Sequence, residues 1–137
     1  LRVKLNWARD AGRDLDLHLV QVVEDEPTEV CTTYWNNMAG CKDTELDQNV
    51  GTGALLGRNG VTSSSLAETI TVHNLAAKSQ HRFMVFVDDN TATGADLGEV
   101  QPQITMTQGS VIVTDQMPQL PMWKEGSRFW LAGAIEV

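Results

Sequence analysis

The chain has 137 residues, of which 42% are hydrophobic and 20% charged, and its formal net charge at pH 7 is −8. This length suffices for one hydrophobic core, so we expect a single domain over residues 1–137. Nucleic acid is excluded as a partner because the ten Lys and Arg residues are scattered and form no basic surface for phosphates, and no apolar run is long enough for membrane insertion as a helix.

Alternation of polar and apolar residues predicts strands along most of the chain. The first covers residues 3–7; because the chain opens directly on this pattern, we expect a mature fragment or an excised domain. A second strand is expected over residues 15–23, and a third over 28–35, which is rich in β-branched and aromatic residues. Five more are expected over residues 68–75, 82–87, 103–107, 110–114 and 128–137.

Residues 36–65 interrupt this series with a long loop rich in Gly and Asn. Loops of this length inside a compact domain are generally functional or held in place by other contacts. No segment has a convincing helical pattern, so parallel strands with helical crossovers are not expected. The sequence therefore predicts an all-β fold, an antiparallel β-sandwich of about eight strands with one long Gly/Asn-rich loop.

The two cysteines, Cys31 and Cys41, are ten residues apart and fit no zinc-binding pattern. We expect a disulfide between them, which would stabilise the fold by roughly 2–3 kcal/mol. A disulfide implies an oxidising compartment, and therefore an extracellular or secreted location. The alternative is two reduced cysteines, one in a strand and one in a loop.

The strand over residues 15–23 has an unusual polar face. Leu15, Leu17 and Leu19 share one face and are expected in the core, whereas Asp14, Asp16 and His18 form a row on the other at intervals of about 7 Å. Two neighbouring carboxylates repel each other. This row therefore needs an Arg, a hydrogen-bond network or a cation to offset the repulsion.

Several short motifs follow one another in a recognisable order. They are Trp7 at the end of the first strand, Asp14-Leu15-Asp16-Leu17-His18, Tyr34-Trp35-Asn36, Leu46-Asp47 and Glu68-Thr69-Ile70. The order resembles that of the YfaP-like domains of unknown function, small β-sandwich modules of secreted and cell-surface proteins. Two departures are Ala67 in place of Pro, and a strand over 82–87 without the family's Gly-x-Tyr opening. The resemblance implies a fold and no particular activity.

The polar positions also suggest a calcium site. Calcium takes about six to eight oxygen ligands. The candidate donors at strand edges and in the long loop are Asp14, Asp16, Asn36, Asn37, Asp47 and Glu68. They would converge if the loop folded back over the polar face at Asp16. The alternatives are that Asp16 accepts hydrogen bonds from loop amides and His18, as an internal clip, or that this face is solvated.

A second candidate site is an apolar binding surface. Met117, Leu120, Met122 and Trp123 lie between and beside prolines in a loop-like segment, where they would form an exposed patch or pack back onto the sandwich. Trp7, Trp35 and Trp130 lie in strand patterns and are expected in the core.

These features favour a non-catalytic extracellular module for adhesion, matrix or assembly, rigidified by calcium. Its partner would be another protein or further copies of itself. The alternative is a carbohydrate- or peptide-binding module, with a glycan or peptide as ligand. A hydrolase is less favoured, because the chain has no G-x-S-x-G elbow, P-loop or H-E-x-x-H motif.

Overall fold

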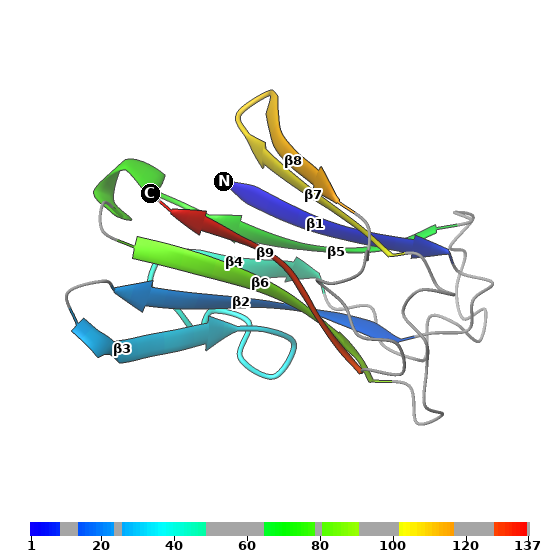
Figure 1. The fold of residues 1–137 in the computed structure, drawn as a ribbon, viewed down its shortest axis with the longest axis horizontal. Coiled ribbons are helices and arrows are strands. Elements are labelled where there is room, and N and C mark those ends of the chain that lie inside the picture. Colours follow the sequence, from blue (N-terminus) through cyan, green and yellow to red (C-terminus); the bar gives the residue numbers. More distant parts are fainter. Residues whose placement is uncertain are drawn as a thin grey trace.

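The computed structural model describes residues 1–8, 14–23, 26–48, 65–78, 81–90, 102–116 and 128–136. Within these ranges the chain forms two antiparallel sheets packed face to face, which confirms the predicted β-sandwich (Figure 1). The elements are β1 (Arg2–Ala8), β2 (Leu15–Val23), β3 (Glu26–Thr33), β4 (Thr44–Gln48), β5 (Ser65–Val72), the 3₁₀ helix η2 (Leu75–Lys78), β6 (His81–Asp89), β7 (Gln103–Gln108), β8 (Val111–Gln116) and β9 (Phe129–Glu136). One sheet has the order β4-β5-β1-β7-β8 and the other β3-β2-β6-β9.

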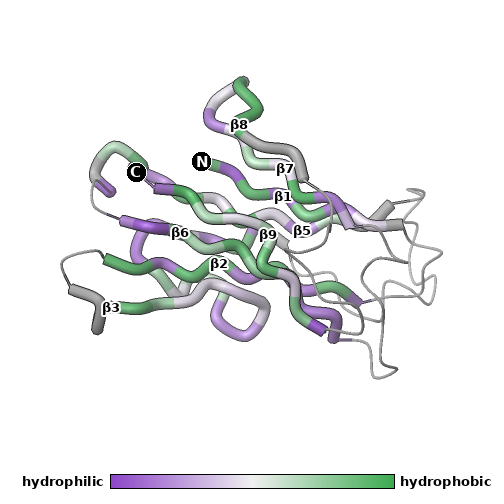
Figure 2. Tube along the Cα trace, viewed as in Figure 1, coloured by the Kyte–Doolittle hydropathy of each residue, from purple (hydrophilic) through white to green (hydrophobic). Residues whose placement is uncertain are grey.

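The core lies between the sheets and follows from the two-residue period of each strand. Figure 2 shows hydrophobic and hydrophilic residues alternating along β2 and β6. The buried apolar side chains are Val3, Leu5, Trp7, Leu15, Leu17, Leu19, Leu46, Ile70, Val72, Phe83, Val85, Val87, Ile104, Met106, Trp130 and Ala132. The expectation of a core position is confirmed for Trp7 and Trp130. It is wrong for Trp35, which is 42% exposed because β3 ends at Thr33 and Trp35 falls in the following turn.

The strand β4 lies within the stretch for which the sequence predicts a loop. It pairs with β5 from Thr44 opposite Val72 to Gln48 opposite Thr69, with an irregularity after Leu46, and it forms one edge of its sheet. Leu46 is buried in the core, which explains why so short a segment is held as a strand. The described residues therefore contain nine strands instead of about eight, and residues 49–64 of the predicted loop lie outside the described ranges.

The predicted disulfide between Cys31 and Cys41 is confirmed, and it joins the end of β3 to the segment before β4. Hydrogen bonds between buried hydroxyls reinforce it. Thr44 Oγ1 donates to the Cys41 carbonyl at 2.7 Å, and the Cys41 amide donates to Thr33 Oγ1 at 3.1 Å. The two hydroxyls are 2.5 Å apart; because Thr44 uses its proton on Cys41, Thr33 is the donor in this pair.

The turn closed by the disulfide has its own backbone pairing. The amides of Tyr34 and Asn37 each donate to the carbonyl of the other, at 3.1 and 2.9 Å. Gly40 then passes so close to the Thr32 carbonyl that an added Cβ would overlap it. Glycine at position 40 therefore permits the close approach that lets the turn fold back on β3.

Candidate functional site

Five carboxylates, four of them on β2, β5 and β6 and one just before β2, gather at the end of the sandwich where β2 begins and β6 ends, on the right in Figure 1. They are Asp14, Asp16, Glu68, Asp88 and Asp89, and all of them are buried. The antiparallel register of β2 and β6 places Asp16 directly opposite Asp88 and Leu15 opposite Asp89. Like charges directly opposite each other on a sheet are destabilising, so the pairing of Asp16 with Asp88 is electrostatically unfavourable when both are ionised.

Glu68 reaches this cluster from the other sheet. It lies on β5 opposite Leu5 of β1, has no exposed surface, and accepts a hydrogen bond of 2.9 Å from the Leu17 amide of β2 through Oε2. The pairing of β3 with β2 starts only at Leu19, so the Leu17 amide lies beyond the end of that ladder. The Glu68 carboxylate therefore provides the acceptor that a carbonyl of a neighbouring strand would otherwise provide. Its hydrogen bond links the two sheets.

This role predicts a difference between two substitutions of Glu68. Glu68→Gln keeps an oxygen acceptor for the Leu17 amide, whereas Glu68→Leu leaves that buried donor unsatisfied. We expect Glu68→Leu to be less stable than Glu68→Gln by about 1–3 kcal/mol. Urea unfolding of both variants at one pH measures this difference. Equal stability of the two variants would show that the hydrogen bond contributes nothing.

Arg128, just before β9, neutralises one member of the cluster. Its Nε and Nη2 donate to the two oxygens of Asp88, at 2.5 and 2.8 Å, and Nη2 also donates to Asn90 Oδ1 at 3.2 Å. A bidentate pair of this kind is one of the stronger charge-assisted arrangements in proteins. Arg128 itself is half exposed, with its guanidinium 5.5 Å from the centre of the Phe129 ring.

Asp16 has a buried carboxylate, one oxygen of which is unpartnered within the described ranges. It is only 2% exposed, and its Oδ2 has no hydrogen-bond partner among the residues that the structure describes. Burial first, and then the negative charges of Glu68, Asp14 and Asp88, raise its pKa to about 7, against the smaller opposing effect of Arg128. Asp16 therefore changes its protonation state near neutral pH in the metal-free protein.

His18 continues the polar row but forms an aromatic contact. Its ring stacks on Tyr34 at a centroid distance of 4.9 Å, and Tyr34 meets the edge of Trp35. Burial lowers the pKa of His18, outweighing the nearby Asp88 charge, so the imidazole is neutral at pH 7. Its Nε2 has no hydrogen-bond partner within the described ranges.

The structure brings together three of the six residues that the sequence suggests as calcium ligands, namely Asp14, Asp16 and Glu68. Asp47 instead pairs with Arg2 at 3.2 Å and accepts a hydrogen bond from Thr71, and its charge is not among those acting on Asp16. Asn36 and Asn37 are exposed in the turn after β3. No three His, Cys, Asp or Glu side chains within the described residues already converge on one ion position.

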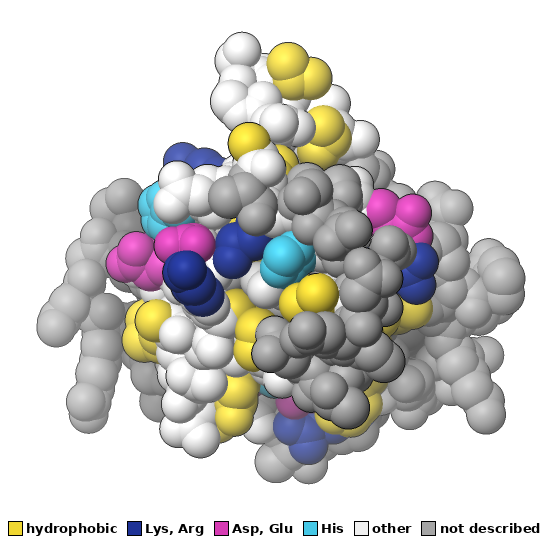
Figure 3. All heavy atoms as spheres, turned by 90° about the vertical axis from the view of Figure 1, so that its left-hand side faces the viewer, with side chains coloured by type: hydrophobic (Ala, Val, Ile, Leu, Met, Phe, Trp, Pro, Cys, Tyr) yellow, Lys and Arg dark blue, Asp and Glu magenta, His cyan; other side chains and the backbone are white. Residues whose placement is uncertain are grey.

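The predicted apolar surface at Met117, Leu120, Met122 and Trp123 lies outside the described residues. A different apolar surface is present on β8, where Val111, Ile112 and Val113 are 62%, 63% and 51% exposed. The β7–β8 hairpin projects from the sandwich in Figure 1, and Figure 3 shows hydrophobic side chains at the top of the molecule, where the hairpin projects. The sequence predicts a strand here, but it does not reveal that this strand lies at a sheet edge.

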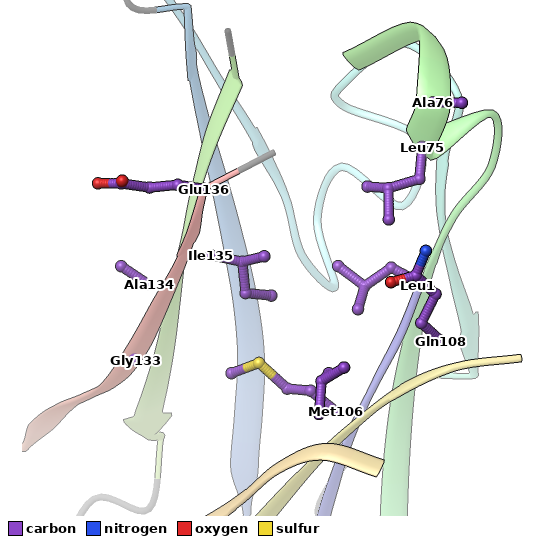
Figure 4. A pocket seen from close by; sticks show the side chains of 10 residues that line it. Leu1, Leu75, Ala76, Met106, Gln108, Gly133, Ala134, Ile135 and Glu136 are labelled. Carbon is purple, nitrogen blue, oxygen red and sulfur yellow. The ribbon is translucent and has the colours of Figure 1, made fainter. Parts of the chain in front are cut away.

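A cavity of about 530 Å³ lies beside this hairpin, between β7–β8 and β9. Figure 4 shows Leu1, just before β1, pointing toward Met106 of β7 and Ile135 of β9, with Leu75 of η2 above them and Glu136 turned away. Val113 of β8 also lines the cavity, so the exposed strand and the cavity form a continuous apolar surface.

Among the described residues, no helix is of a length and apolarity that would allow it to span a membrane. Searches against family models, curated proteins and solved structures found no match to this chain.

Proposed function

We propose that this protein is a non-catalytic structural module of an extracellular assembly, and that it contacts a second copy of itself through β8. The observation that carries this proposal is the exposure of Val111, Ile112 and Val113 on an edge strand. The disulfide between Cys31 and Cys41 supports the extracellular part, since disulfides persist mainly in oxidising compartments.

Edge strands present unpaired backbone groups that accept a further strand, and proteins usually protect them with charges or prolines. The exposed run on β8 has neither, because it consists of three uncharged β-branched residues. Antiparallel pairing of two β8 strands centred on Ile112 places Val111 of one copy opposite Val113 of the other. Such pairing brings no like charges together over these three residues, and β-branched pairs stabilise sheets.

The cavity favours a second candidate function, that of a peptide-binding module. Its volume of about 530 Å³ is within the range of ligand sites, and its lining side chains are mainly apolar. An extended peptide added along β8 would place alternate side chains toward the cavity. A module of this kind would be a monomer in the absence of its ligand, which separates it from the first proposal.

The self-association proposal predicts that Ile112→Lys weakens dimer formation at least tenfold, because it puts two ammonium groups opposite each other at the centre of the pairing. Sedimentation equilibrium over a range of concentrations measures this constant. The matched control is Val30→Lys, since Val30 is a valine of similar exposure, 54%, on the edge strand β3 of the other sheet. A wild-type protein that stays monomeric at millimolar concentration, or equal weakening by both lysines, would contradict the proposal.

A further inference from the structure

The acidic end of the sandwich places several carboxylates around the buried Asp16. The described charges that act on Asp16 are the carboxylates of Glu68, Asp14 and Asp88 and the guanidinium of Arg128. Three of these charges are negative and one is positive, and the neutral His18 ring adds no positive charge. A buried carboxylate such as Asp16 in these surroundings is costly unless a proton, a donor or a cation offsets its charge.

The buried Asp16 oxygen distinguishes this cluster from an ordinary acidic surface. Asp16 is almost fully buried, yet Oδ2 has no hydrogen-bond partner within the described part of the chain. A buried carboxylate oxygen without a donor is unfavourable, because it loses its water and gains nothing in return. Asp14, two residues earlier and just before β2, is a second carboxylate close enough for its charge to act on Asp16.

We propose that Asp14 and Asp16 bind one calcium ion, with the Glu68 carboxylate beside them completing the negative environment. Both oxygens of Asp88 accept hydrogen bonds from Arg128, so Asp88 lies at the edge of this site and is not proposed as a ligand. Asp16 lies on β2, in the other sheet from β8, and this inference does not depend on self-association.

The donor chemistry selects calcium among divalent cations. The donors are carboxylates, which are hard oxygen ligands, and zinc would call for nitrogen or sulfur ligands. Because three acidic or histidine side chains do not converge within the described residues, backbone carbonyls and water must supply the remaining ligands. Calcium tolerates such irregular coordination, whereas magnesium demands near-ideal octahedral geometry. Sites with few charged ligands in extracellular modules bind with dissociation constants of about 10⁻⁴–10⁻³ M, and we expect a value in that range.

Calcium titration of the full chain tests the proposal. We expect equilibrium dialysis at pH 7.5 to show one ion per chain, and calcium at a tenfold excess over Kd to raise the melting temperature by about 5 °C relative to chelator. Ionic strength is held constant with NaCl, and MgCl₂ at the same concentration is expected to give a smaller rise.

Three variants locate the ion. Asp14→Asn and Asp16→Asn are expected to weaken calcium binding at least tenfold. Asp47→Asn is the matched control, because Asp47 is also acidic and sequence-predicted as a ligand but pairs with Arg2. Absence of binding to the wild type at 10 mM calcium, about ten times the weakest expected Kd, would overturn the proposal. So would binding that Asp16→Asn retains, which would assign the ion to another site.

Discussion

Replacing Asp16 with Asn is expected to stabilise the protein at pH 8 in the presence of chelator. Asp16 is buried beside Glu68, Asp14 and Asp88, and its pKa in the folded protein is about 7, against an ordinary value of 3.8. The folded state therefore binds a proton at Asp16 that the unfolded chain has already released at neutral pH. This proton contributes stability that is fully present below pH 4 and is lost as the pH rises through about 7.

The separation of the two pKa values sets the size of the effect. About three pKa units at roughly 1.4 kcal/mol each correspond to a loss on the order of 4 kcal/mol by pH 8. Asparagine has nearly the same shape and carries no charge at any pH, so Asp16→Asn removes this loss. The variant should match the wild type below pH 4, exceed it increasingly between about pH 4 and pH 7, and keep a nearly constant excess above that.

Urea unfolding with chelator, from pH 4 to pH 8.5, measures this difference in stability. The difference between wild type and variant isolates Asp16 from the other carboxylates, which titrate in both proteins. Asp47→Asn is the control, and its difference from the wild type should show no such rise between pH 4 and pH 7. A constant difference between Asp16→Asn and the wild type across this range would show that Asp16 is ionised in the folded state throughout.

A bound calcium ion and a proton on Asp16 would each reduce the repulsion between Asp16 and the neighbouring carboxylates. In chelator, the proton on Asp16 relieves the repulsion only below pH 7. A bound calcium ion would relieve it above that pH as well, and would keep Asp16 ionised. The pH dependence of the wild type should therefore become shallower in excess calcium, whereas that of Asp16→Asn should not change.

The strand pattern in the sequence predicts most of the fold, because each core strand buries every second residue. It does not predict β4, in which Leu46 is the only apolar residue and is surrounded by Thr, Glu, Asp and Gln. That segment becomes a strand because β5 offers it an edge and the core accepts Leu46. Both conditions are tertiary, and neither can be seen in a five-residue window.

Only the part of the candidate site that lies along one strand is predictable from the sequence. The row from Asp14 to His18 follows from the two-residue period of one strand. Asp88 and Arg128 join it through the register of β2 with β6 and through a contact 40 residues apart in sequence. Asp47 shows the same dependence on neighbours: its oxygen donors suit calcium, and the sequence does not reveal that the fold places Arg2 beside it. The chemistry of a side chain is visible in the sequence, whereas its neighbours depend on strand pairing.

Removing the disulfide with Cys31→Ser and Cys41→Ser together is expected to destabilise the protein by about 3 kcal/mol. The bond closes a short loop, with a separation of ten residues, and so restricts the unfolded chain in that region. Within the folded loop, the hydrogen bonds among Thr33, Cys41 and Thr44 and the close approach of Gly40 to Thr32 already hold the backbone in place. The double variant should therefore still fold, with the loss arising mainly in the unfolded state.

Urea unfolding separates this explanation from a loss of native contacts. If the disulfide acts on the unfolded chain, the double variant should show a steeper dependence of the unfolding free energy on urea, because its unfolded state exposes more surface. A reducing agent should lower the stability of the wild type to that of the variant and leave the variant unchanged. An unchanged slope together with a large loss of stability would instead mean that the bond maintains the folded turn itself. In that case the stacking of Tyr34 on His18, which lies at the end of the same turn, should be lost with it.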